Sequence, residues 1–219
     1  MQSLLFDLDG TLLDHFTCLA RCYEHVLTDL HQPIPARDQV RRAVGGSVEL
    51  TMAKFVPEEL HKEACARWKE YLKEILCEDA YLMPGALSLI QALKAQGNQL
   101  AVFTNKVGVH SRTLCDHLEI SQYMDAVVGA DDTPYRKPQK EFSEHVLKIL
   151  NANPETTVLI GDSPFDIQAA HAIGIPAHCV ITGTHSAEEL IEAKADGVYP
   201  DLPTLGKTLF NLDLLTEFA

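Results

Sequence analysis

The spacing of hydrophobic and polar positions divides the chain into stretches that predict different elements. Residues 3–8 form a short, mostly apolar run, which predicts a buried strand. Between about residues 14 and 80, apolar side chains recur every three or four positions, as they do on one face of an amphipathic helix. This part of the chain is expected to be entirely helical, with helices over residues 15–30, 37–44 and 58–76.

After Pro84 and Gly85 the pattern becomes an alternation of helices and strands. This alternation predicts an α/β fold, a Rossmann-like and mostly parallel sheet with helices on both faces. The helical stretch interrupts the sheet after its first strand. We therefore expect a core of residues 1–13 and 84–219 and a small all-helical domain of residues 14–83. The expected strands are 99–103, 126–129, 157–160 and 177–181, and the expected helices are 86–95, 108–118, 140–150, 166–173 and 186–194.

Composition narrows the class of protein. The 219 residues are 46% hydrophobic, which is enough for one substantial core and a small second one. With 31 acidic and 18 basic residues, the net charge of -13 argues against nucleic acid as a partner. No window reaches the roughly 18 apolar residues of a membrane span, and the first apolar run meets Asp7 before a signal sequence could form. The six cysteines are scattered and are interpreted as reduced thiols, so we expect a cytoplasmic protein.

Polar and acidic residues follow the predicted strands where each strand ends. Ligands of an open parallel sheet bind outside the carboxyl ends of its strands. We therefore expect these residues to lie along one edge of the sheet. In chain order they are Asp7 and Asp9, Thr104 and Asn105, Asp131 and Asp132, and Asp162.

The first pair, Asp7 and Asp9, stands two residues apart at the end of the first predicted strand, and Gly10 allows a sharp turn there. Taken alone, this could be a polar turn capped by its own side chains. Two carboxylates this close ionise together only if a cation or a difference in protonation separates them. That difference suits a pair in which one acid is a nucleophile and the other a general acid.

A second acidic pair follows the strand at 157–160. Asp162 is expected to bind a metal ion, whereas Asp166 could ligate the ion or cap the helix that begins there. Oxygen ligands from Asp7, Asp162 and a backbone carbonyl, assigned to Asp9, predict Mg²⁺ rather than Zn²⁺. Whether Asp166 would ligate directly or through water stays open.

An anionic substrate at this acidic edge would need local donors. Thr104 could hold a phosphoryl oxygen with its hydroxyl group, together with the backbone N–H of Asn105. Lys137 or Arg136 could supply the fixed cation.

Four short motifs occur in order near strand ends: Asp7-x-Asp9-Gly10-Thr11, Thr104-Asn105, Lys137-Pro138 and Gly161-Asp162-x-x-x-Asp166. Together they resemble the motifs of the haloacid dehalogenase (HAD) superfamily, whose inserted cap domain the helical stretch matches. The resemblance implies that Asp7 attacks phosphorus and becomes an aspartyl phosphate, while Asp9 protonates the leaving oxygen and later activates water. It also implies that Mg²⁺, Thr104 and Lys137 neutralise the transferred group. Family members that displace halide lack the second acid, whereas phosphatases and phosphomutases keep it, so Asp9 argues against dehalogenation.

Within the superfamily, the chain most resembles phosphoglycolate phosphatases and their pyrophosphatase relatives. Thr104-Asn105-Lys106 carries this likeness, as does Val40-Arg41-Arg42-Ala43-Val44-Gly45-Gly46 in the helical stretch. The resemblance implies a small phosphorylated metabolite as substrate, bound by Thr104, Asn105 and Lys137. Gly45 and Gly46 either close over this substrate or only separate two helices. Gln139-Lys140-Glu141 stands where this subgroup often has a second proline, which leaves the substrate open.

Three alternatives remain at this point. A phosphomutase of the β-phosphoglucomutase type uses the same acids, and a pyrophosphatase would use the same core. A protein of another class, a binding or regulatory protein, could use this core without catalysis, although every acid that the reaction needs is present. The sequence does not decide between a monomer and a homodimer.

Overall fold

The computed structural model describes residues 2–43 and 47–214. The chain divides into two compact units, one made of Met1–Asp14 with Tyr81–Ala219 and the other of His15–Ala80. The first unit holds the sheet and the second holds helices α1 to α4. The role of the helical unit as a cap stays a prediction.

A six-stranded parallel sheet forms the centre of the first unit, in the order β5-β4-β1-β6-β7-β8. Strand β1 lies between β4 and β6, with Phe6 opposite Val102 on one side and Ile160 on the other. The residue after β1 therefore emerges at the middle of the carboxyl edge. The predicted α/β fold class is confirmed. The strands are β1 (Ser3–Phe6), β4 (Gln99–Phe103), β5 (Ala126–Val128), β6 (Thr157–Gly161), β7 (Ala177–Val180) and β8 (Gly197–Tyr199).

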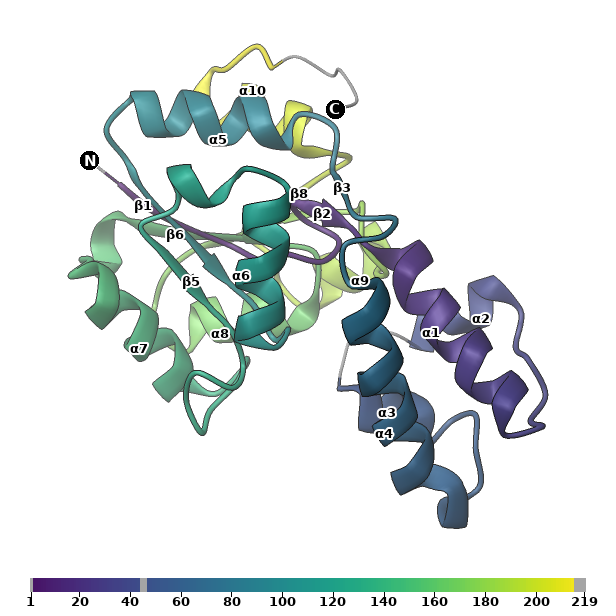
Figure 1. The fold of residues 1–219 in the computed structure, drawn as a ribbon. Coiled ribbons are helices and arrows are strands. Elements are labelled where there is room, and N and C mark those ends of the chain that lie inside the picture. The colour runs from purple at the N-terminus through teal and green to yellow at the C-terminus, as the bar shows by residue number, and fades with distance from the viewer. Residues whose placement is uncertain (1, 44–46, 215–219) are drawn as a thin grey trace. The chain divides into compact units, whose positions relative to one another are not determined.

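Both faces of the sheet are covered by helices (Figure 1). On one face, Leu5 belongs to a buried cluster with residues of α7 (Lys140–Leu150), α8 (Pro164–His171) and α9 (Ala187–Glu192). Side chains alternate along a strand, so Leu4 and Phe6, also fully buried, face the opposite side. Helices α5 (Ala86–Ala95) and α10 (Leu202–Phe210) lie there. Packing on both faces fixes β1, and with it the chain direction at Asp7.

Several elements of this unit were not predicted. Strands β2 (Leu13–Asp14) and β3 (Tyr81–Leu82) pair antiparallel but have two residues each, too few for a sequence pattern. Strand β8 and helix α10 extend the fold beyond the last predicted helix. Asp201 caps α10 by accepting a hydrogen bond from the backbone N–H of Thr204. The remaining elements are α6 (Gly108–His117) and the short 3₁₀ helices η1 (Ser121–Tyr123) and η2 (Pro154–Thr156).

The helical unit has its own core. Its helices are α1 (Phe16–Asp29), α2 (Arg37–Ala43), α3 (Val48–Met52) and α4 (Glu58–Ile75). Tyr23 of α1 packs against Trp68 of α4 and against Phe55, with ring centroids 5.5 and 6.0 Å apart. The apolar spacing that predicted α1 and α4 therefore reflects one shared interface. Gly45 and Gly46 lie outside the described residues.

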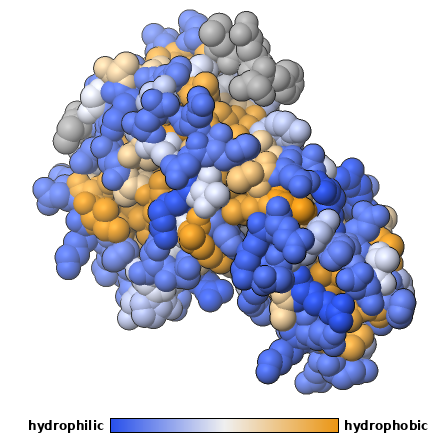
Figure 2. All heavy atoms as spheres, viewed as in Figure 1, coloured by the Kyte–Doolittle hydropathy of each residue, from blue (hydrophilic) through white to orange (hydrophobic). Residues whose placement is uncertain are grey.

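The surface in view is mainly hydrophilic on each unit, interrupted by separate hydrophobic patches (Figure 2). Across residues 2–43 and 47–214, no helix has both the length and the apolar character needed to cross a membrane.

Candidate active site

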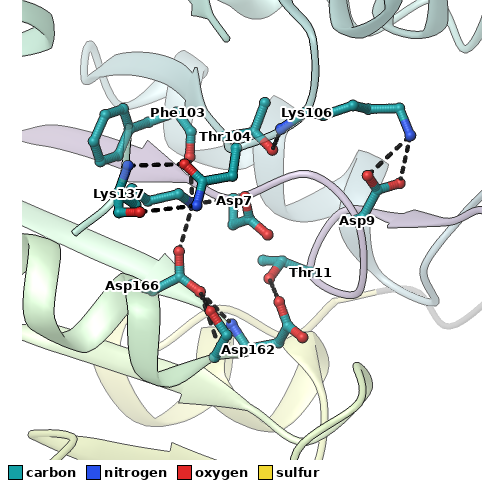
Figure 3. A network of polar contacts seen from close by, with 11 residues as sticks. Asp7, Asp9, Thr11, Phe103, Thr104, Lys106, Lys137, Asp162 and Asp166 are labelled. Atoms are coloured by element: carbon teal, nitrogen blue, oxygen red, sulfur yellow. Dashed lines mark hydrogen bonds and ion pairs between the residues drawn. The ribbon is translucent and has the colours of Figure 1, made fainter. Parts of the chain in front are cut away.

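The carboxyl ends of three neighbouring strands bring most of the predicted site residues together (Figure 3). Asp7 follows β1, Thr104 follows β4 and Asp162 follows β6. Lys137, from the loop after β5, reaches the same place and is only 3% exposed. Its neighbour Arg136 is exposed. Of the two cations considered, Lys137 is therefore the one that lies among the acids.

The ammonium group of Lys137 connects two of these acids. Its Nζ donates to Asp7 Oδ1 at 2.7 Å, to Asp166 Oδ1 at 2.5 Å and to the carbonyl oxygen of Phe103 at 2.9 Å. Burial lowers the pKa of Lys137, but Asp166 and Asp7 outweigh this effect, so its pKa is raised. Lys137 is therefore held in its charged form, and its ammonium group donates one hydrogen bond to each of Asp7, Asp166 and Phe103.

Asp166 is fully buried and accepts hydrogen bonds on both oxygens. Oδ2 accepts from the backbone N–H of Ser163 at 3.0 Å and from Ser163 Oγ at 2.5 Å, while Oδ1 accepts from Lys137. Ser163 and Asp166 form a capping box at the start of α8. The capping role considered for Asp166 is thus present, and a metal ion would have to compete with these donors.

Asp162 is enclosed by backbone that comes close to its carboxylate. Thr11 Oγ1 lies 3.4 Å from Asp162 Oδ1. A Cβ atom at Gly10 would lie 2.7 Å from Asp162 Oδ2, and one at Gly183 would lie 2.8 Å from Asp162 Cβ. Gly10 also has φ +86°, a backbone conformation that side chains disfavour. Glycine at these two positions therefore makes room for the Asp162 carboxylate.

Asp7, Asp162 and Asp166 each offer an oxygen within 4.8 Å of the others. Burial raises the pKa of Asp7 to about 6, with Lys137 opposing the change. Burial, then Asp7 and Asp166, raise the pKa of Asp162 well above its usual range. Three carboxylates face one ammonium group, so full ionisation leaves two negative charges unbalanced. A divalent cation bound by oxygen ligands would balance them.

Asp9 points to a different partner. Its Oδ1 and Oδ2 lie 3.1 and 2.9 Å from Lys106 Nζ (Figure 3). The Asp9 side chain is 33% exposed, whereas that of Lys106 is 8% exposed. Asp9 is thus the more accessible acid next to Asp7.

Thr104 and Asn105 both lie at this edge, but their side chains bond to protein. Thr104 Oγ1 accepts from the backbone N–H of Lys106 at 3.2 Å, which leaves its hydroxyl proton for another acceptor. The Asn105 carboxamide bonds to the main chain of Lys137. The Asp131 side chain accepts a hydrogen bond from the backbone N–H of Gly108, the first residue of α6. The Asp132 side chain accepts one from the backbone N–H of Gly129, which follows β5.

Sequence reasoning did not assign site roles to Thr11, Lys106 or Gly183. Thr11 and Lys106 were part of recognised motifs, which was the available signal. Gly183 carried none, because it follows β7 by three residues in a loop without a motif.

Comparisons with known proteins identify the family of this chain. A family model described as haloacid dehalogenase-like hydrolase matches residues 4–180. The chain is therefore an enzyme, a hydrolase with a Rossmann-like core. It belongs to the haloacid dehalogenase-like hydrolase family, as its motifs predicted.

Relatives and solved structures narrow the class. A phosphoglycolate phosphatase of Thiobacillus denitrificans is 28% identical over 210 residues, covering 92% of each chain. A phosphoglycolate phosphatase of Aquifex aeolicus is 30% identical, covering 84% of this chain and 86% of its own. The crystal structure of a predicted phosphoglycolate phosphatase from Haemophilus somnus superposes with a TM-score of 0.84 at 25% identity, covering 92% of this chain and 94% of its own. The predicted enzyme class, a HAD-type phosphatase, is confirmed.

Proposed function

We propose that this chain is a magnesium-dependent phosphomonoester hydrolase that acts on a small phosphorylated metabolite through a phosphorylated Asp7. One observation carries the proposal: Asp7 Oδ1 is paired with Lys137 Nζ at 2.7 Å in a buried site. Among the described residues only Lys137 donates to this side chain, so Asp7 Oδ2 accepts no hydrogen bond there. One oxygen is held and the other is available for attack.

The donor set fits magnesium. We assign direct ligation to the carboxylates of Asp7 and Asp162 and to the backbone carbonyl of Asp9, an all-oxygen set. Asp166 would act mainly through Lys137, because its oxygens already accept hydrogen bonds. When bound, magnesium would supply positive charge that offsets the negative charge of the phosphoryl group.

The reaction would proceed in two steps. In the first, an oxygen of Asp7 bonds to phosphorus while the bond to the leaving oxygen breaks, and Asp9 transfers a proton to that oxygen. In the second, Asp9 takes a proton from water, the water oxygen attacks phosphorus, and the bond to Asp7 breaks. Lys137 offsets charge on Asp7 throughout, and the Thr104 hydroxyl donates to a phosphoryl oxygen.

The names of the relatives make 2-phosphoglycolate the first substrate to test. The helical unit, including Gly45 and Gly46, is assigned to substrate selection. The test is release of inorganic phosphate from a panel of phosphorylated metabolites, with Mg²⁺ or with excess EDTA. Release by a folded Asp7→Asn protein, or full activity in EDTA, would refute the proposal. A requirement for a bisphosphorylated activator without net phosphate release would indicate a phosphomutase instead.

A further inference from the structure

Asn105 forms two hydrogen bonds with the main chain of a single residue, Lys137. Its Oδ1 accepts from the backbone N–H of Lys137 at 2.8 Å, and its Nδ2 donates to the carbonyl oxygen of Lys137 at 3.0 Å. These are the groups that a neighbouring strand would pair. The side chain thus holds the peptide groups on both sides of the Lys137 Cα.

Lys137 needs such a partner. The residue is 3% exposed, and buried backbone N–H and C=O groups are costly to leave unpaired. A lysine side chain also has four rotatable bonds, so its ammonium group is well placed only if its Cα is fixed.

Residues at and just after the carboxyl end of β4 bond to both the ammonium group and the main chain of Lys137. The carbonyl oxygen of Phe103 accepts from Nζ at 2.9 Å, and the side chain of Asn105 holds the main chain. Phe103 and Asn105 flank Thr104 in the sequence. One short segment therefore fixes both the main chain of Lys137 and the position of its ammonium group, which lies 2.7 Å from Asp7 Oδ1.

We propose that Asn105 is a positioning residue for the reaction, whose side chain acts through Lys137 on Asp7 and does not bind substrate. The inference rests on the proposed function for its catalytic consequence. It assigns the carboxamide to Lys137, because both of its polar ends already bond there, and it does not concern the backbone N–H of Asn105, which the sequence assigned to a phosphoryl oxygen.

The chemistry of the pair requires an amide. Lys137 presents one donor and one acceptor, so its partner must offer one acceptor and one donor. A carboxylate at position 105 would place an acceptor against the Lys137 carbonyl oxygen, and alanine would offer neither bond. Glutamine adds one carbon, which changes the distance.

The experiment compares Asn105→Ala with Asn98→Ala in the otherwise unchanged protein. Asn98 is a matched control, because it precedes β4 at the opposite end and also bonds two backbone groups. Its Oδ1 accepts from Gln2 N at 3.0 Å and its Nδ2 donates to Leu93 O at 3.1 Å. Both variants lose comparable hydrogen bonds, but only one touches Lys137.

With Mg²⁺ and p-nitrophenyl phosphate, Asn105→Ala should lower kcat roughly 10- to 100-fold, since small misplacements of reacting groups cost this much. KM should change less than about threefold. Asn98→Ala should leave both constants unchanged. In a Lys137→Met background, adding Asn105→Ala should cost little more, because the residue acts through the lysine. A raised KM with unchanged kcat, or losses that multiply in the double variant, would overturn the proposal, as would unchanged kinetics.

A second measurement does not depend on activity. The ammonium group of Lys137 should give a protected ¹H–¹⁵N signal, identified by its loss in Lys137→Met. This signal should shift or disappear in Asn105→Ala and persist in Asn98→Ala. A persisting signal in both variants would refute the positioning role. If the wild type released no phosphate from any substrate, the proposed function would fail, and this signal would still decide the role of Asn105.

Discussion

Lys137 Nζ lies 2.7 Å from Asp7 Oδ1, and the side chains of the two residues are 2% and 12% exposed. Asp166 shares the same ammonium group at 2.5 Å. Burial works against every charge in this cluster, while the ion pairs work in its favour. The stability of the site should therefore depend on pH and on cations.

The first prediction concerns Asp7 and pH. Burial raises the pKa of Asp7 from 3.8 to about 6, so the folded protein holds this proton more tightly than the unfolded chain does. The contribution of Asp7 to the free energy of unfolding is then complete below about pH 4 and is lost as pH rises through about 6. The full difference corresponds to about 3 kcal/mol. Urea denaturation of metal-free protein between pH 4 and 7 measures it, with Asp7→Asn as the reference that lacks the titration.

Mg²⁺ should reverse that loss. Because the ion favours ionised carboxylates, its stabilising effect should be larger at pH 7 than at pH 5. Melting temperatures with and without Mg²⁺ at both pH values test this expectation. An equal Mg²⁺ effect at both pH values would contradict the assignment of Asp7 as a ligand.

The second prediction concerns Lys137. Lys137→Met keeps most of the side-chain volume but leaves Asp7 and Asp166 without their cation. Breaking a buried pair in this way costs roughly 3–5 kcal/mol, so urea denaturation at pH 7 should reveal a large loss. The loss should be smaller at pH 5, where Asp7 is mostly protonated. Lys140→Met is the control, because Lys140 forms an exposed pair with Glu144 and little change is expected. Equal effects of the two substitutions would contradict the buried pair.

Periodicity predicted most of the fold because each long element buries one regular face. The run at residues 3–8 predicted β1, and the three- and four-residue spacing predicted α1 and α4. It could not predict β2 and β3, since two-residue strands are defined by their pairing with each other. The start of α8 was expected at Asp166 but lies at Pro164, because Ser163 caps the helix and proline suits its first turn.

The site was predictable where a strand end placed an acid, as at Asp7 and Asp162. It was less predictable where a role depends on contacts across the chain. Asn105 lies beside a predicted phosphate-binding threonine, and only the fold reveals that its carboxamide bonds to Lys137. The close approach of Gly183 to Asp162 likewise depends on two loops that are 21 positions apart.

The third prediction concerns Gly183. A Cβ atom here would lie 2.8 Å from Asp162 Cβ and even closer to its carboxylate. Gly183→Ala should therefore displace the Asp162 carboxylate and weaken Mg²⁺ binding by about tenfold or more. Titration calorimetry of the metal-free protein with Mg²⁺ measures this directly.

Gly174→Ala controls for backbone strain. Gly174 has φ +73° with open space around its Cβ position, so alanine there should cost about 1 kcal/mol of stability. It should leave Mg²⁺ affinity unchanged. Wild-type affinity in a folded Gly183→Ala protein would show that this glycine does not shape the metal site.

The last prediction concerns Asp9, whose carboxylate is held by Lys106 in this structure. For Asp9 to protonate a leaving group, at least one of its oxygens must turn from Lys106 to the substrate. Asp9→Asn removes the transferable proton but keeps the backbone carbonyl assigned to the metal, so Mg²⁺ affinity should change little. An alkyl leaving group needs protonation in the transition state, whereas p-nitrophenolate needs it far less.

Asp9→Asn should therefore slow formation of the phosphorylated enzyme about 10²- to 10⁴-fold with alkyl phosphates, and much less with p-nitrophenyl phosphate. Steady-state turnover would hide the difference, because Asp9 also activates water in the second step. The informative measurement is the pre-steady-state burst of p-nitrophenolate, which should survive in the variant while later turnover slows. Rapid-quench measurement of phosphorylated enzyme gives the same step for the alkyl substrate. Equal first-step losses for both leaving groups would mean that Asp9 is not the general acid, and the role would then pass to a group that the variant leaves intact.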